Sequence, residues 1–431
     1  MKKVPVVKIT TPQAASELSG LPMEATVAMA DVASAMREGL LAFSAAAGLV
    51  VMRQMLDAEL ESIVGAKHAK IGEERVGNWH GTTTGQVVLG ARKISVERPR
   101  GRLVDGGEIE LDTWATFASE DLLRQVVVER MLAGVATRRH VEVAEPVGAL
   151  TGVAVSKSAV SRRFVAATTA AVAEMLAADL SKLETAALMI DGLNVAGEMI
   201  VVALVITADG TKVPVGLRLG DTENSVVVKD LLADLVDRGL RFEHGILAVL
   251  DGSKALRKGV AKVFGAKAIV QRCTLHKRRN VTDYLPAARR KAFDKRLAGI
   301  FANTDAEAGL RDARRLAAQL KRDHPDAAGS LLEGLEEMFT VARLGITGAL
   351  RRSLTNTNCI ESMISTVRVV THRVKTWQDG DMKKRWIATG MIEAQRSFRR
   401  VRGHTQMTEL VTRIGQAINP ATPTIYTQEV A

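Results

Sequence analysis

The sequence predicts an α/β fold with a mixed five-stranded sheet. Between residues 185 and 273, five apolar segments of strand length alternate with turns and helix-like segments. Short turns join the first three, which favours antiparallel pairing, whereas helices separate the last two, which favours parallel crossovers. Two of the apolar segments end in Asp-Gly, at Asp191 and at Asp251.

The residues before this unit predict a helical region and then a small sheet. Residues 31–65 are rich in Ala, Leu, Met and Glu, with apolar side chains at near-helical spacing. Short β segments are expected at 86–89, 93–97 and 108–111. Basic residues punctuate these segments and could follow a phosphate backbone or line a solvated edge. They are Arg92, Lys93, Arg98, Arg100 and Arg102.

A basic segment further along has the pattern of two helices around a turn, at 137–141 and 156–164. In the second helix, Ser156 or Ser158 would cap the amino end, while Val160 and Phe164 would pack inward. The polar side chains would then face phosphates or base edges, although an ordinary connector with a basic face explains them equally well. They are Lys157, Ser161, Arg162 and Arg163.

The segments of the central unit follow one order. A strand ends at Asp191, and two more are expected at 199–206 and 213–219. A helix near 224–238, a strand at 246–250 before Asp251, a helix at 253–264 and a strand at 267–272 complete the unit. This is the order of the ribonuclease H-like fold. Two other acids, Asp221 and Glu223, are interpreted as part of a helix start.

A charged helical stretch, 284–352, predicts an insertion before the last part of this core. Its apolar residues Leu310, Ala313, Leu316, Ala317 and Leu320 share one helix face. After it, apolar residues at 360, 363, 364 and 367 predict a helix that begins near Glu361. An alternative reading makes Asn358 and Glu361 a capping pair that satisfies free amide groups.

These patterns divide the chain into seven regions. A helical region (1–80), a small β region (81–116) and a helix-turn-helix-like DNA-binding region (117–180) come first. The first part of the core (181–283), the helical insertion (284–352) and the last part of the core with Glu361 (353–405) follow, and a tail (406–431) ends the chain.

Three carboxylates, those of Asp191, Asp251 and Glu361, would repel one another if they met without a cation. Mg²⁺ or Mn²⁺ removes that conflict, because hard oxygen ligands suit these ions. Two such ions can activate an attacking oxygen and stabilise the leaving oxygen in phosphoryl transfer. The three acids therefore predict a metal site.

Composition points to a nucleic-acid partner and away from membranes. The formal charge is +11 and the pI is about 9.7, and no apolar stretch reaches the roughly 20 residues of a membrane span. Two cysteines in 431 residues exclude a disulfide framework and favour a reducing compartment. We expect a cytoplasmic, nucleoid-associated protein.

Several residues together resemble those of the prokaryotic Mutator-type (MULE-like) insertion-sequence transposases. They are Asp191, Asp251 and Glu361 in their contexts, Cys273-Thr274-Leu275-His276, and Trp377 with Trp386. The resemblance implies a DDE transposase that holds two Mg²⁺ or Mn²⁺ ions on the three acids. It also implies cleavage of double-stranded DNA at the terminal inverted repeats and transfer of the freed 3′-OH to target DNA. Because two ends are handled together, a homodimer or higher homo-oligomer is expected.

Cys273 and His276 match the family's Cys-x-x-His signature near the active centre. A role in orienting the catalytic strand or in contacting DNA is favoured over zinc, since a structural zinc site normally takes four ligands. Candidate DNA contacts are Lys157, Arg162, Arg163, Arg368, Arg373, Lys375, Lys383, Lys384, Arg385 and Trp377. Two other functions fit the same residues: a structure-selective ribonuclease H-like DNA nuclease, and a catalytically inactive DNA-binding regulator.

Overall fold

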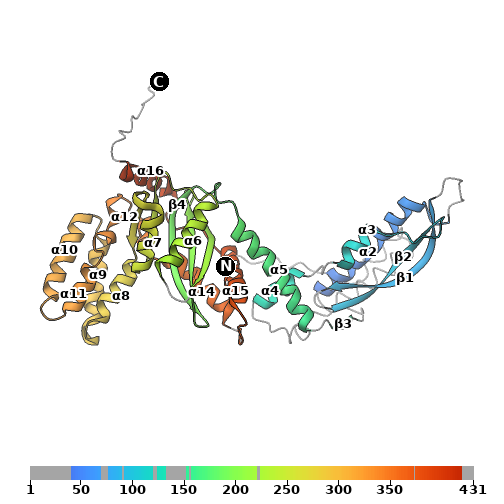
Figure 1. The fold of residues 1–431 in the computed structure, drawn as a ribbon, viewed down its shortest axis with the longest axis horizontal. Coiled ribbons are helices and arrows are strands. Elements are labelled where there is room, and N and C mark those ends of the chain that lie inside the picture. The colour runs from blue at the N-terminus through green and yellow to red at the C-terminus, as the bar shows by residue number, and fades with distance from the viewer. Residues whose placement is uncertain are drawn as a thin grey trace, which may run out of the picture. The chain divides into compact units, whose positions relative to one another are not determined.

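The chain forms two compact units, Met1–Ala166 and Ala167–Ala431, in a computed structural model (Figure 1). The structure describes residues 40–68, 76–89, 92–119, 124–132, 152–154, 157–220, 224–372 and 374–419. The two units are described separately below. The seven regions expected from the sequence stay predictions.

The first unit packs one long helix against a three-stranded sheet. Helix α2 (Leu40–Val64) confirms the expected helical region, and Met52, Leu56 and Leu60 on one of its faces are fully buried against the sheet. Strands β1 (Gly77–Leu89), β2 (Arg92–Leu103) and β3 (Gly152–Ala154) pair in that order, each antiparallel to the next. The two short helices are α3 (Asp112–Ser119) and α4 (Arg124–Leu132).

The β segments of this unit differ from those expected. Strands β1 and β2 have 13 and 12 residues, against the four and five predicted, because they continue past the expected ends through glycines such as Gly85 and Gly101. A Cβ atom at Gly85 would lie 2.2 Å from the ring of Trp114, so only glycine lets that ring pack on the sheet. The predicted strand at 108–111 is wrong, since Glu108 makes only an isolated bridge to Arg102.

Helix α5 (Lys157–Ala177) is one continuous helix. Val160 and Phe164 are 1% and 2% exposed, which confirms that these two side chains pack inward. Ser158 lies inside the helix and therefore does not cap it. Ser156 and the partner helix expected at 137–141 lie outside the described residues, so the helix-turn-helix stays a prediction.

The second unit contains the predicted mixed sheet. Its strands are β4 (Thr185–Val195), β5 (Glu198–Thr207), β6 (Lys212–Gly220), β7 (Ile246–Leu250) and β8 (Ala268–Arg272). They lie in the order β6-β5-β4-β7-β8. The first three pair antiparallel, and β4, β7 and β8 pair parallel, as the loop lengths had predicted.

Helices cover both faces of this sheet, which explains why its strands are nearly continuous apolar runs. On one face Leu188 and Ile190 pack against α6 (Ser225–Asp237) and α7 (Lys254–Phe264). On the other, Met189 packs against α14 (Asn358–Thr371), α15 (Gly380–Arg396) and α16 (Met407–Ile418). Figure 1 shows α6 and α7 in front of β4. Two short 3₁₀ helices, η3 (Gly265–Lys267) and η5 (His404–Gln406), complete these layers.

The stretch predicted as a helical insertion is helical and has a core of its own. It follows α8 (Thr274–Asp283) and consists of α9 (Ala287–Ala302), α10 (Ala306–Leu320), α11 (Pro325–Leu332), η4 (Glu336–Met338), α12 (Thr340–Arg343) and α13 (Gly348–Leu354). The apolar face expected on α10 is buried in this core around Phe339. In Figure 1 these helices lie beside the sheet, on the side of α7.

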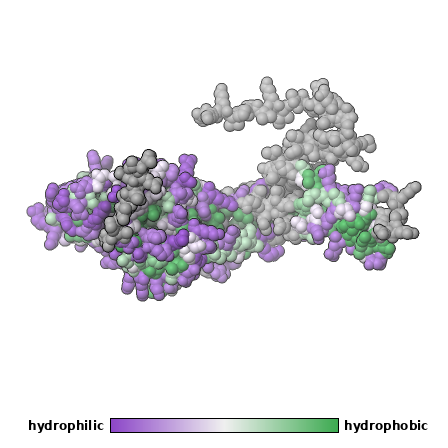
Figure 2. All heavy atoms as spheres, turned by 90° about the horizontal axis from the view of Figure 1, so that it is seen from above, coloured by the Kyte–Doolittle hydropathy of each residue, from purple (hydrophilic) through white to green (hydrophobic). Residues whose placement is uncertain are grey.

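Over the described ranges, no helix has both the length and the apolar character needed to span a bilayer. Hydrophilic residues cover most of the face of the second unit that Figure 2 shows.

Candidate active site

Asp191 and Asp251 stand at equivalent positions on neighbouring strands. Strand β4 pairs parallel with β7, and Ile190 lies opposite Leu250. The residue that follows each of them in the sequence is an aspartate. Adjacent strands lie about 4.8 Å apart, which brings the two backbones close together at this point. The pairing of two strands that are distant in sequence therefore builds the first half of the site.

The prediction that a strand ends at Asp191 is wrong. Strand β4 continues to Val195, because its other edge pairs with β5 from Asp191, opposite Val202, to the hairpin turn. Ala196 and Gly197 form that turn with positive φ angles of 50° and 83°. Asp191 therefore projects from the middle of a paired strand, which holds its backbone rigidly.

Asp251, by contrast, directly follows a strand, as predicted. Its Oδ1 accepts a hydrogen bond from the backbone N–H of Ser253 at 2.8 Å. The hydroxyl of Ser253 in turn caps α7 by accepting from the N–H of Leu256 at 3.3 Å. Gly252, at φ 118°, allows the sharp turn between strand and helix. The start of α7 thus fixes the direction of the Asp251 side chain.

Cys273 and His276 lie beside this aspartate pair. The N–H of Cys273 donates to the carbonyl of Leu250, the last residue of β7, at 2.7 Å. Cys273 is fully buried and precedes α8, and His276 lies in the first turn of that helix. The family signature therefore lies directly after the fifth strand and next to Asp251.

Glu361 comes from the first turn of α14, where sequence periodicity predicts a helix start. Its Oε1 accepts a hydrogen bond from the hydroxyl of Thr357 at 2.5 Å and lies 3.8 Å from Nδ1 of His276. The alternative capping pair is wrong, because Thr357 occupies the N-cap position and Asn358 is already helical. Glu361 is thus turned toward Thr357 and His276 instead of back to the backbone.

Two hydrogen bonds hold the loop before α14 against α8. Both the N–H and the hydroxyl of Thr274 donate to the carbonyl of Thr355, at 2.9 Å and 3.0 Å. The segments they join are 81 residues apart in sequence. These bonds place the Glu361 turn beside the Cys273–His276 turn.

The charges of the two other acids act on Asp191. Burial raises the pKa of Asp191 to about 7, the charge of Asp251 adds to that increase, and Glu361 contributes more weakly. The Gly192 N–H, which donates to Asp191 Oδ1 at 2.8 Å, and His276 act in the opposite direction. Without a cation, Asp191 is therefore only partly ionised at neutral pH.

His276 is the nearby cation. Its hydrogen bond with Cys273 raises the pKa of His276 to about 9, against the effect of burial, and the charges of Cys273, Glu361 and Asp251 add to the increase. Burial opposes ionisation of Cys273, but its hydrogen bonds with His276 and Thr357 outweigh burial and lower its pKa. At neutral pH the imidazole therefore carries positive charge beside the acids.

Two sets of side chains are candidates for a metal site, and among the described residues only the second already has its donor atoms within 4.8 Å of one another. Asp191, Asp251 and Glu361 offer only oxygen atoms, which suits Mg²⁺ or Mn²⁺. Donor atoms of Cys273, His276 and Glu361 all lie within 4.8 Å of one another, and that mixed set would suit zinc.

The position of Thr357 disfavours zinc in the second set. Its hydroxyl oxygen lies 3.4 Å from Cys273 Sγ, 3.4 Å from His276 Nδ1 and 2.5 Å from Glu361 Oε1, so it already bridges the three donors. Zinc requires separations of roughly 2.0–2.3 Å and a fourth ligand. The geometry therefore favours an orienting hydrogen-bond network around Glu361. Sequence reasoning missed Thr357, although a Thr four residues before a Glu is a detectable helical spacing.

The predicted DNA contacts are scattered over the structure. Lys383 is 8% exposed and donates to Glu198 Oε1 at 2.6 Å, so it stabilises the fold instead of facing solvent. Trp377 packs partly against the core below α14 and α15. Arg162, Arg368 and Lys375 are exposed, whereas Arg163, Lys384 and Arg385 are half-buried. Arg373 and the side chain of Lys157 lie outside the described residues.

The basic residues between 92 and 102 form a basic ribbon along β2, and its charge is partly neutralised. Arg100 pairs with Glu108 at 2.9 Å, and Arg98 lies 3.9 Å from the same carboxylate. The Arg98 guanidinium also stacks 5.0 Å from the ring centre of Trp114. These contacts favour the solvated-edge interpretation of the ribbon.

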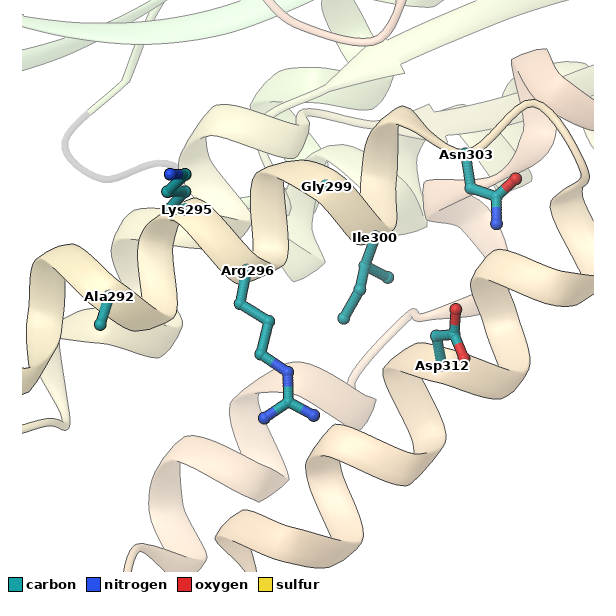
Figure 3. Close-up of a pocket in the computed structure, with 7 residues that line it drawn as sticks. All are labelled: Ala292, Lys295, Arg296, Gly299, Ile300, Asn303 and Asp312. Carbon is teal, nitrogen blue, oxygen red and sulfur yellow. The ribbon is translucent and has the colours of Figure 1, made fainter.

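A shallow pocket of about 480 Å³ in the insertion lacks the chemistry of a catalytic site. Figure 3 shows Arg296 and Ile300 on α9, Asn303 just after it and Asp312 on α10 around the pocket. Asp312, its single lining carboxylate, pairs with Arg315 at 3.6 Å. The candidate active site is therefore the acid group at the sheet.

Comparison with known proteins identifies the family. The sequence profile described as "Transposase, Mutator family" matches residues 25–400. The chain is 22% identical over 365 residues to the transposase of insertion sequence ISRM5 of Rhizobium meliloti (strain 1021), covering 84% of this chain and 89% of that relative. It is 26% identical over 333 residues to the transposase of IS256 in transposon Tn4001 of Staphylococcus aureus, covering 74% and 81%. The transposase of ISRM3 of Rhizobium meliloti (strain 1021) is 29% identical over 175 residues, covering 40% and 42%. The chain belongs to the Mutator family of transposases.

Proposed function

We propose that this chain is a DDE transposase of a bacterial insertion sequence, with a ribonuclease H-like core. In this proposal Asp191, Asp251 and Glu361 form one catalytic site. The main support is the parallel register of β4 and β7, which brings Asp251 beside Asp191, where burial raises the pKa of Asp191 to about 7 and the charge of Asp251 adds to the increase. The strand order β6-β5-β4-β7-β8, with two antiparallel pairs followed by two parallel pairs, agrees with the proposed core.

The residues present fit Mg²⁺ or Mn²⁺. The acids are half-buried, and a cation would favour the ionised form of Asp191 against the burial and the charge of Asp251 that together keep it partly protonated. Asp191 and Asp251 each use Oδ1 to accept one backbone hydrogen bond, and Glu361 uses Oε1. Asp191, Asp251 and Glu361 are the residues that would hold the ions.

The side chains divide the work of the reaction. When bound, the two ions would supply the Lewis acidity that activates an attacking oxygen and stabilises the leaving oxygen. Asp191 and Asp251 would be held by strand pairing and the start of α7, so their carboxylates are preorganised. Thr357 would orient Glu361, and the positive charge of His276 would attract the scissile phosphate. No protein nucleophile is needed, because water and then a DNA 3′-OH attack in turn.

Double-stranded DNA is the proposed substrate, in the form of the element's terminal inverted repeats and the target. The formal charge of +11 favours a polyanionic partner. Handling two DNA ends at once would require at least two copies of the chain.

A strand-transfer assay tests this function. Purified full-length protein is incubated with Mg²⁺, a labelled duplex carrying the DNA ends that flank its gene, and a target plasmid. Covalent joining of the labelled 3′ end to the plasmid is the expected result. Cutting without joining would instead support the structure-selective nuclease. Binding without cutting, in Mg²⁺ and in Mn²⁺, would support the inactive regulator.

A further inference from the structure

A basic groove adjoins the acid site in the second unit. Its volume is about 1160 Å³, and it runs between the helical insertion and the segment that follows α15. Asn358 and Ser362 of the Glu361 turn line it, as does Thr274 at the start of the His276 turn. The groove therefore begins at the helical turns that carry two of the site residues.

The charge of this groove is strongly one-sided. Seven cationic side chains line it and no carboxylate does. They are Lys212, Arg278, Arg351, Arg352, Arg399, Arg400 and Arg402. Seven of the other fifteen lining residues carry hydroxyl or amide groups, and these groups commonly bind phosphate oxygens as well.

Four of these cations have structural partners. Arg278 pairs with Asp294 at 2.5 Å, and Arg400 pairs with Asp209 at 3.3 Å. Arg351 is 7% exposed and donates to the carbonyls of residues 301, 302 and 303, which fastens α13 to the end of α9. Lys212 lies 4.7 Å from the ring centre of Phe398.

The other three, Arg352, Arg399 and Arg402, are exposed and have no ion pair with any acid in the described part of the chain. Their backbones are nevertheless well placed. The hydroxyl of Ser353 donates to the carbonyl of Arg402 at 3.2 Å, and the N–H of Val401 donates to the carbonyl of Gly210 at 2.9 Å. Fixed backbones with unneutralised guanidinium groups are suited to a polyanionic ligand.

We propose that this groove binds the sugar-phosphate backbone of the DNA strand that enters the acid site, with Arg352, Arg399 and Arg402 as its main phosphate contacts. The inference rests on the proposed function for the identity of the polyanion. Guanidinium contacts to phosphates position DNA without reading its sequence, so the groove binds DNA of any sequence. The residues named earlier from sequence as DNA contacts do not include these three.

The salt dependence of DNA binding tests the groove without any catalysis. The full-length wild type and an R352Q/R399Q/R402Q variant are titrated, in EDTA, with fluorescent DNA of random sequence, as a duplex and as a single strand. Each lost phosphate contact lowers the slope of log K against log salt by about 0.9 for a duplex and about 0.7 for a single strand. We expect the slope to fall by about 3 with the duplex and about 2 with the single strand.

Two matched variants control the result. K262Q/R311Q/K321Q removes three exposed basic residues outside the groove and should keep the wild-type slope. R352K/R399K/R402K keeps the charge and should keep most of the slope, which separates phosphate contact from a folding defect. Circular-dichroism melting checks that each variant is folded.

The outcomes are distinct from those of the strand-transfer assay. The proposal is wrong if the groove variant keeps the wild-type slope with both DNA forms. It is also wrong if the slope of the control variant falls as much as that of the groove variant. A change with the single strand alone assigns the groove to unpaired DNA, and a change with both forms assigns it to duplex DNA as well. If the slope falls while strand transfer is absent, the groove stands and the proposed reaction fails.

Discussion

The hydroxyl of Thr357 donates a hydrogen bond to Oε1 of Glu361, one helical turn away, at 2.5 Å. The hydroxyl oxygen of Thr357 also lies 3.4 Å from Sγ of Cys273 and 3.4 Å from Nδ1 of His276, and these two residues belong to a segment more than 80 residues earlier. Thr357 therefore connects the Cys-x-x-His signature to the Glu361 carboxylate. Such outer contacts orient a metal ligand and set its basicity.

We expect Thr357→Val to lower metal-dependent DNA cleavage by about 10- to 100-fold, because loss of an outer hydrogen bond to a ligand typically has that effect. Thr357→Ser keeps the hydroxyl and should keep most of the activity. Thr366→Val, on the same helix but bonded only to the Ser362 carbonyl, is the matched control. Initial cleavage rates at several Mg²⁺ concentrations measure the effect. Wild-type rates in Thr357→Val would remove the orienting role.

Asp251→Asn and Glu361→Gln should each reduce cleavage and joining by more than about 100-fold, beyond the effect expected for an outer-sphere change. A neutral amide binds a divalent ion poorly, whereas affinity for DNA depends on basic residues elsewhere and should change little. Asp312→Asn, in the pocket of Figure 3, controls for loss of a carboxylate. Gel assays of cleavage and a filter-binding assay give the two readouts. Full activity in either site variant rejects that residue as a ligand.

Asp191→Asn should stabilise the metal-free protein at pH 8 while it abolishes activity. The pKa of Asp191 is raised from 3.8 to about 7, so the folded state holds a proton that the unfolded state has lost between these pH values. Stability from this group is therefore present below pH 3.8 and is lost as the pH rises to about 7. At 1.36 kcal/mol per pKa unit the loss is at most about 4 kcal/mol, reduced by solvent screening.

Thermal unfolding in EDTA measures this effect. The variant should melt above the wild type at pH 8, and the difference should shrink at pH 5. Adding Mg²⁺ should raise the melting temperature of the wild type and leave that of the variant unchanged, because ligand binding to the folded state stabilises it. If the variant melts below the wild type at pH 8, the ionised Asp191 carboxylate does not destabilise the folded protein, and the argument from its raised pKa is wrong.

Lys383→Met should destabilise the second unit and leave the salt dependence of DNA binding unchanged. Lys383 is 8% exposed and Glu198 is 36% exposed in its side chain, so the substitution leaves a partly buried carboxylate without its partner. Removing one member of a buried pair costs about 3–5 kcal/mol, and partial exposure of Glu198 lowers our expectation to about 2 kcal/mol. Urea denaturation measures the loss. A fall in the salt slope would restore Lys383 as a DNA contact.

Sequence by itself determined the order of strands and helices along the second unit, and it selected the three acids that are proposed as the site. Each is a local property: an apolar run shows a strand, a 3.6-residue period shows a helix, and Asp-Gly marks a turn. The strand at 246–250, the helix that carries Glu361 and the buried face of α10 were accordingly predicted correctly. Local signals failed at Asp191, because pairing with β5 carries that strand beyond the Asp-Gly turn signal.

Tertiary structure alone decided which residues meet. The register between β4 and β7, the Thr357 contacts to Cys273 and His276, and the burial of Lys383 against Glu198 join residues 60 to 185 positions apart. The basic groove likewise gathers residues from 212 to 402. A pattern of residue types states what each segment can bury or bind. Only packing of the whole core selects which segments become neighbours, because burial energy depends on the summed contacts and not on sequence distance.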